Sequence, residues 1–176
     1  HAPKNGFFFT IDRTSGKLID AKPYVDGINW ATGYDLTTGR PIENPEARFY
    51  KTGKPFIAIP GALGAHNWHP MSYNPATGLV YIPAQQIQQG YLQDMDELDK
   101  RKVLGFNVGT SLNKTMLPDD KAAFKAAIAA TTGRLVAFDP RTGKVAWGVD
   151  YPAAWNGGTM TTAGNLVFQG TSTGRF

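Results

Sequence analysis

The 176-residue chain has no cysteine, and this absence excludes several kinds of site at once. Within these residues there can be no disulfide framework, thiolate zinc site, cysteine nucleophile or haem attached through cysteine. The compartment stays open, because exported proteins can also lack cysteine. Long apolar runs are missing too. Nothing approaches the roughly 20 residues that a bilayer crossing needs, so we expect no membrane span.

Neither sign of charge is in large excess. Eighteen Lys and Arg against fourteen Asp and Glu give a formal charge of +4, and the cations are scattered rather than gathered into a stripe. Nucleic acid is therefore not an expected partner. The chain starts without methionine and without the basic-then-apolar order of a signal peptide. We expect it to begin inside a larger protein.

Glycine and proline, by contrast, are abundant, with 20 and 12 residues, which favours many short elements joined by tight turns. One phrase recurs: Asp or Asn, three positions ending in Ser or Thr, then Gly. The opening side chain can bond the backbone two residues on, and Gly accepts a positive φ, so each phrase predicts a hairpin corner. The phrase stands at 12–17, 35–40, 74–79 and 139–144, with a degraded copy at 171–175.

Runs of apolar β-forming residues flank these turns and predict strands. They lie at 7–11, 79–82, 135–138, 144–147 and 165–169. Repeated four-stranded sheets of roughly 40 to 50 residues are typical of β-propellers, and on that spacing the chain holds about three to four blades. A propeller usually needs about four to eight blades to close, so we expect an all-β fold that is a partial β-propeller.

Two segments, 94–104 and 119–130, break the β pattern. The second is rich in alanine and acidic at its start, with Pro118 ahead of it and Gly133 beyond, which predicts a short helix. We interpret 86–132 as an insertion between strands, inside a single propeller domain that takes in residues 1–176.

The densest group of unusual side chains lies in the loop at 61–70. His66 and His69 stand three residues apart with no third ligand in view, which favours capping or core hydrogen bonding over a metal pair. Asn67 and Trp68 either pack under a blade or offer an amide and a flat aromatic face to a planar ligand.

Two further positions stand out. Trp155 opens the run Trp155–Thr159, which repeats the same aromatic, amide and glycine chemistry, and its glycines permit close approach to a ligand. Lys4 directly precedes a strand, where a solvated ammonium and a functional one look alike. We find no Ser/His/Asp arrangement, no paired catalytic carboxylates and no dinucleotide fingerprint.

Several longer sequence segments resemble those of a known protein family, which composition alone does not indicate. They are Pro3–Phe8, Asp12–Arg13, Gly33–Asp35, Gly39–Arg48, His66–Trp68, Pro70–Ser72 and Trp155–Gly170. In these phrases the chain resembles the quinoprotein alcohol dehydrogenases that use pyrroloquinoline quinone, especially their type II quinohaemoprotein branch. That family has an eight-bladed propeller with tryptophan-docking motifs, and Ala137–Trp147 is similar to such a motif.

The resemblance implies roles for four residues. Lys4 falls where the family places a cation that hydrogen-bonds the quinone oxygens. Asn67 and Trp68 fall in a loop that contacts the cofactor, and Trp155 resembles a further cofactor-adjacent indole. The family's general base is an Asp, and its calcium is held by that Asp with a Glu and an Asn. All of these precede the position of Lys4, so we expect no catalytic base and no metal ligand in this chain.

The resemblance further implies a piece of a periplasmic enzyme that oxidises small alcohols to aldehydes by hydride transfer to pyrroloquinoline quinone. Electrons would pass to a cytochrome or to a domain carrying haem c, which would lie beyond Phe176. We expect the piece alone to be inactive and to self-associate through its uncovered strand edges. Two alternatives stay open: a non-catalytic propeller that serves as scaffold or binding module, and a quinoprotein that oxidises polymers or sugars.

Overall fold

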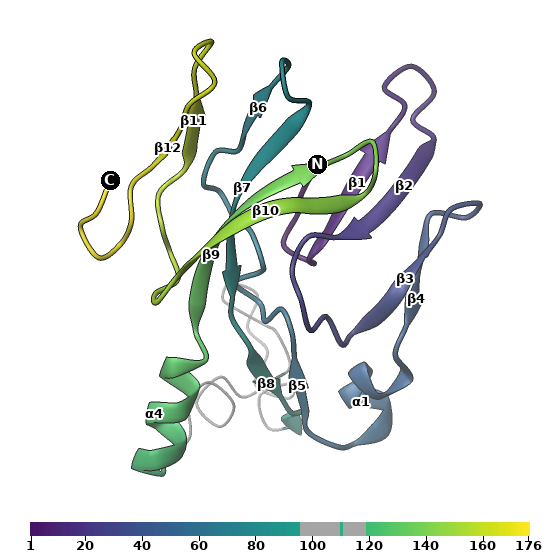
Figure 1. The fold of residues 1–176 in the computed structure, drawn as a ribbon. Helices are drawn as coiled ribbons and strands as arrows, with labels where there is room; N and C mark the ends of the chain where they lie inside the picture. Colours follow the sequence, from purple (N-terminus) through teal and green to yellow (C-terminus); the bar gives the residue numbers. More distant parts are fainter. Residues whose placement is uncertain (96–109, 111–118) are drawn as a thin grey trace, which may run out of the picture.

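The computed structural model describes residues 1–95, 110 and 119–176, and strands dominate it (Figure 1). The strands are β1 (Phe7–Ile11), β2 (Leu18–Pro23), β3 (Ala31–Asp35), β4 (Arg40–Glu43), β5 (Phe56–Ala58), β6 (Ser72–Asn74), β7 (Leu79–Gln86), β8 (Gln89–Tyr91), β9 (Thr132–Asp139), β10 (Lys144–Tyr151), β11 (Thr159–Thr161) and β12 (Val167–Gln169). The described helices are the 3₁₀ turn η1 (Pro45–Ala47), α1 (Phe49–Thr52) and α4 (Lys121–Ala129). The predicted all-β character is confirmed.

The recurring turn phrases close hairpins, as predicted. They join β1 to β2, β3 to β4, β6 to β7 and β9 to β10. In each, the glycine N–H donates to the carbonyl of the opening Asp or Asn at 2.8–2.9 Å. The opening side chain accepts from the N–H two residues on, also at 2.8–2.9 Å. The glycines adopt φ between 67° and 73°, a region that other residues rarely enter.

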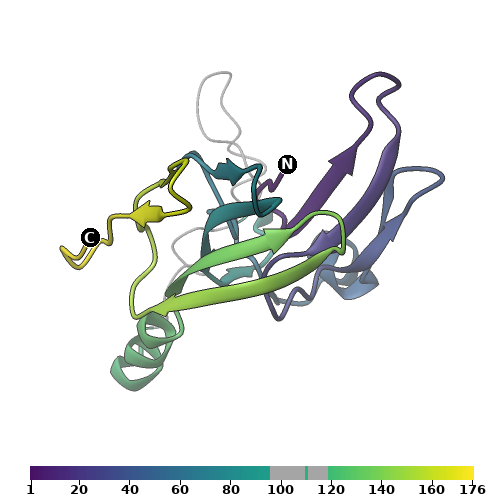
Figure 2. The same ribbon diagram turned by 45° about the horizontal axis from the view of Figure 1, so that its top comes forward.

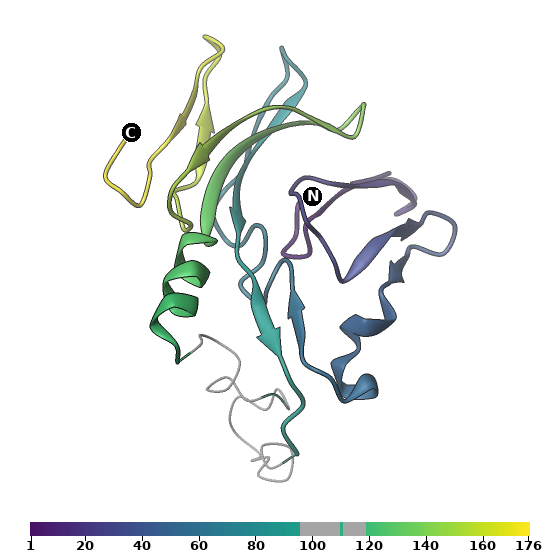
Figure 3. The same ribbon diagram turned by 60° about the horizontal axis from the view of Figure 1, so that its bottom comes forward.

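The largest sheet is antiparallel, with strand order β10-β9-β7-β6. Its central pair, β7 with β9, runs in register from Val80 opposite Phe138 to Gln86 opposite Thr132. Figures 1 to 3 all place this sheet between the β11–β12 hairpin on one side and the β1–β2 hairpin on the other, with β3–β4 beyond β1–β2. The sheets in the described part of the chain form no closed ring.

Residues 87–131 separate the paired strands β7 and β9 along the chain. The segment leaves through β8, which pairs with β5, and returns through α4 (Figure 3). The helix expected near 119–130 is α4, and the Asp120 carboxylate caps it by accepting from the Ala123 N–H at 2.8 Å. Of the other segment expected to break the β pattern, residues 96–104 lie outside the described residues.

The core lies where the large sheet meets β1 and β2. Ile82 and Val136 have no exposed surface, and Phe138, which is 1% exposed, stacks on Phe8 with ring centroids 4.7 Å apart. Tyr24 is buried in the same cluster, and burial raises the pKa of its hydroxyl. No helix in the described ranges is both long and apolar enough to cross a membrane.

Truncating the core tests this packing. Phe138→Ala is expected to lower the free energy of unfolding by about 3 to 5 kcal/mol, because it removes a fully buried ring and leaves a cavity. Phe124→Ala on α4, where the ring is 43% exposed, is the matched control and should cost far less. Urea unfolding measures both, and equal losses would contradict this description of the core.

The hairpin corners make a prediction about pH. Hydrogen bonds from the Thr14 hydroxyl and backbone N–H lower the pKa of Asp12 from 3.8 to about 2. A carboxylate whose pKa is lower in the folded state stabilises that state above the unfolded pKa, and the contribution is lost as the pH falls from about 3.8 through about 2.

Thr14→Ala should therefore raise the pKa of Asp12 toward 3.8 in a carboxyl NMR titration. Asp35, whose own turn also lowers its pKa, should titrate unchanged in this variant. An unchanged Asp12 titration would show that the hydroxyl is not responsible.

Candidate functional site

The segment before β1, which carries Lys4, is held by its backbone. Each carbonyl oxygen from Ala2 to Gly6 has a hydrogen-bonding partner from another part of the chain. These partners are His66 Nδ1 at 2.6 Å, the Tyr24 hydroxyl at 2.6 Å, the Ala65 N–H at 2.9 Å, the Trp30 indole N–H at 3.0 Å and the Tyr24 N–H at 3.0 Å. The position of Lys4 is therefore set without use of its side chain.

The Lys4 side chain lies against the loop at 61–70. Gly64 has φ of 84°, and a Cβ placed on it would lie 2.6 Å from Lys4 Cβ and Cγ. Glycine is therefore required for this close approach. Lys4 is exposed, and in the part of the chain that the structure describes its ammonium makes no hydrogen bond or ion pair.

The loop that packs on Lys4 also contributes to a row of three rings, those of Trp68, His69 and Trp155. Trp68 stacks on His69 with centroids 4.1 Å apart and an interplanar angle of 24°, and His69 faces Trp155 at 5.3 Å. Trp68 is 76% exposed and Trp155 38%, whereas His69 is buried. Burial lowers the pKa of His69 and the nearby His66 lowers it further, which favours the neutral ring between the two indoles.

The loop at 61–70 holds its own shape through side chains that the sequence singled out. His66 is buried, and its Nδ1 and Nε2 lie 2.6 and 2.8 Å from the carbonyls of Ala2 and His69, which is the core hydrogen bonding expected for it. The Asn67 amide donates to the Leu63 carbonyl at 2.9 Å. In the described residues no three His, Asp or Glu side chains are placed to share a metal ion.

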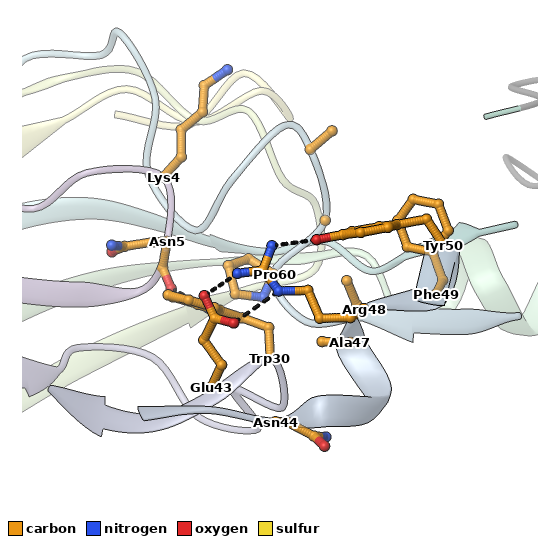
Figure 4. A pocket seen from close by; sticks show the side chains of 13 residues that line it. Lys4, Asn5, Trp30, Glu43, Asn44, Ala47, Arg48, Phe49, Tyr50 and Pro60 are labelled. Atoms are coloured by element: carbon orange, nitrogen blue, oxygen red, sulfur yellow. Dashed lines mark hydrogen bonds and ion pairs between the residues drawn. The ribbon is translucent and has the colours of Figure 1, made fainter. Parts of the chain in front are cut away.

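Beside Lys4 is a hollow of about 480 Å³ whose walls are largely aromatic and apolar (Figure 4). Trp30, Phe49 and Tyr50 line it. Arg48 pairs with Glu43 through two contacts, one from Nε at 2.8 Å, and donates to the Tyr50 hydroxyl at 2.9 Å. Hydrogen bonding by Arg48 lowers the pKa of Glu43. Figure 4 shows the Lys4 ammonium directed away from this ion pair.

The structure gives Asn156 a different role from the one its sequence context suggested, and it shows a role for Gln85, which the sequence did not single out. Asn156, which looked like an amide for a ligand, is buried, donates to the Ala153 carbonyl at 2.9 Å and accepts from the Ser172 N–H at 3.0 Å. Gln85 was not singled out, yet it bonds both loops that carry the aromatic row. The signal that could have found it is a polar residue inside the buried run of β7.

The sequence and the structure were compared with those of known proteins. No family model matches the chain. It is 46% identical, over its full length, to the dehydrogenase subunit of an alcohol dehydrogenase (quinone) from Komagataeibacter europaeus, and 48% identical, over 99% of its length, to a quinohemoprotein alcohol dehydrogenase from Comamonas testosteroni. The solved structure of quinohemoprotein alcohol dehydrogenase ADHIIG from Pseudomonas putida HK5 superposes on 98% of the chain with a TM-score of 0.88 and 42% identity.

These likenesses confirm that the fold is part of a quinoprotein β-propeller. By sequence and by structure the chain corresponds to one segment of the quinone-dependent alcohol dehydrogenases. It spans about a quarter of the length of the curated relatives it matches, 24% in both cases given above.

The residues present fit pyrroloquinoline quinone in their donor chemistry. A flat quinone needs aromatic faces, and the Trp68 indole is largely uncovered. Its oxygens need a cation, and Lys4 is an exposed ammonium without a partner in the described ranges. Trp68 and Trp155 flank His69 in one row, and Lys4 packs on Gly64 of the loop that carries Trp68 and His69.

The contact between Gly64 and Lys4 makes a prediction. Gly64→Ala should destabilise the fold by about 1 to 3 kcal/mol more than Gly53→Ala, because it adds a clash to the cost of a positive φ. Gly53 is the matched control, since its φ is 66° and a Cβ there would meet nothing within 4 Å. Thermal or urea unfolding measures the difference, and equal losses would mean that Lys4 does not pack on this glycine.

Proposed function

We propose that this chain forms part of an alcohol dehydrogenase that uses pyrroloquinoline quinone, and that Lys4, Asn67, Trp68 and Trp155 hold that cofactor. One observation carries the proposal: Lys4, whose ammonium has no partner in the described residues, projects from a segment fixed by its carbonyls and packs on the loop that carries the open indole face of Trp68. The names of the relatives support the same function.

Bound pyrroloquinoline quinone supplies a carbonyl carbon that accepts the hydride from the alcohol carbon. Lys4 would donate to an oxygen of the bound quinone and stabilise the negative charge that develops there, from a main-chain position that its carbonyl bonds hold in place. An ammonium has no lone pair, so Lys4 polarises and does not abstract a proton. The faces of Trp68 and Trp155 orient the flat ring and exclude water from it.

In the family that the chain resembles, the reaction also needs a general base, an Asp, and a Lewis acid, the calcium ion. Glu43 shares the hollow with Lys4, but Arg48 occupies its carboxylate, so we do not assign it the role of base. We propose that another part of the complete protein supplies the general base and the calcium ligands. Turnover of alcohol is then not expected from these 176 residues alone.

The same proposal covers substrate, electron acceptor and compartment. We place the protein in the periplasm, with a small alcohol as substrate and a cytochrome or a haem domain as electron acceptor. The name "quinohemoprotein" carried by the Comamonas relative supports a haem in the complete protein. Exposed apolar side chains such as Ile19, Ile42 and Ile57 would lie against neighbouring blades, and in the isolated chain they would favour self-association.

Removing the ammonium tests the function. In the complete protein loaded with quinone and calcium, Lys4→Met should lower kcat about 100- to 1000-fold, the usual cost of removing a donor to a developing oxyanion. Lys17→Met, at an exposed turn, is the matched control and should keep the wild-type rate. Steady-state oxidation of alcohols with an artificial electron acceptor measures both, and a Lys4→Met enzyme within twofold of wild type would contradict the proposal.

A further inference from the structure

We propose that Gln85 is a positioning residue that fixes the Lys4 side of the cofactor site relative to its aromatic side. The inference rests on the function proposed above and adds to it a residue that does not itself touch the cofactor. Gln85 lies at the end of β7, is 4% exposed, and bonds both loops that carry the predicted cofactor contacts.

The first set of bonds reaches the loop at 61–70. The Gln85 side-chain amide donates to the Gly64 carbonyl at 3.0 Å, and its backbone N–H donates to the Ala65 carbonyl at 2.8 Å. Both of these residues contact Lys4, Gly64 through van der Waals packing and Ala65 by its N–H to the Lys4 carbonyl at 2.9 Å. Gln85 therefore braces the part of the loop at 61–70 on which Lys4 packs.

The second bond reaches the loop that carries Trp155. The Gln85 side-chain oxygen accepts from the Trp155 N–H at 3.3 Å. Trp155 has φ of 58°, a left-handed conformation that bulky residues rarely adopt unless their surroundings hold them. This conformation places the indole 5.3 Å from His69, on which Trp68 stacks. Gln85 thus supports the strained residue at one end of the aromatic row.

Only an amide makes both side-chain bonds. Its NH₂ donates to Gly64 while its oxygen accepts from Trp155, whereas a carboxylate accepts only and a thioether makes neither bond well. A buried amide is costly unless its groups are bonded, and here both are. Gln86, the next residue, points to the other side of the strand and donates to the Asp26 carbonyl at 3.0 Å. It offers a matched control for each substitution.

The test uses the complete protein, with Gln85→Met and Gln85→Glu compared with Gln86→Met and Gln86→Glu. In the cofactor-free protein, a quinone titration followed by absorbance should show the Kd raised at least tenfold in both Gln85 variants and less than twofold in both Gln86 variants. At saturating quinone, the KM for alcohol should stay within twofold of wild type. Hydrogen exchange of the cofactor-free protein should be faster at residues 153–158 in Gln85→Met, which loses the bond to Trp155, and unchanged there in both Gln86 variants.

Other outcomes would overturn the inference. Gln85 variants that melt at lower temperature but bind quinone within twofold of wild type would show a role in folding alone. If Gln85→Glu does not fold, Gln85→Met decides the question, and if neither folds the positioning role is wrong. A wild-type protein that binds no quinone would contradict the proposed function itself, and this inference with it. Normal wild-type binding with unaffected Gln85 variants would contradict only the inference.

Discussion

The pairing of β7 with β9 is the interaction on which the rest of this structure depends. It brings together two strands from distant parts of the chain, and it buries Ile82 and Val136 completely. β7 is covered along most of its length, so its course is set by the core. The C-terminal end of β7 lies between the loops at 61–70 and 152–158, and Gln85 forms hydrogen bonds with both loops there. Core packing and site geometry are thereby joined in one strand.

In the candidate site, the groups that hold the structure together are different from the groups that are available to a ligand. Around Lys4 the backbone carbonyls make the structural bonds, and the ammonium is left available. In the aromatic row, His69 is buried and its pKa is lowered, while Trp68 stays open to solvent. Such an arrangement leaves an ammonium and an aromatic face available to a ligand.

Features that arise locally were predictable from the sequence. The turn phrases formed hairpins because Asp or Asn, a short polar run and Gly are enough to close them. The pairing of β7 with β9 across the intervening segment was not readable, since it depends on packing between distant residues. The cofactor roles of Lys4, Asn67, Trp68 and Trp155 are implied by family resemblance. The residues alone left Asn67 and Trp68 open between packing under a blade and binding a planar ligand, and they did not separate a functional Lys4 from a solvated one. Gln85 and the positive φ of Trp155 depend on tertiary contacts, so only the structure reveals them.

The central claim is that Lys4 and the indoles of Trp68 and Trp155 face one flat quinone. A crystal structure of the complete protein with pyrroloquinoline quinone bound tests it most directly. The account predicts a planar ligand in contact with both indoles, with a quinone oxygen within hydrogen-bond distance of Lys4 Nζ. A ligand bound away from these side chains, or a Lys4 ammonium turned to solvent in that complex, would contradict it.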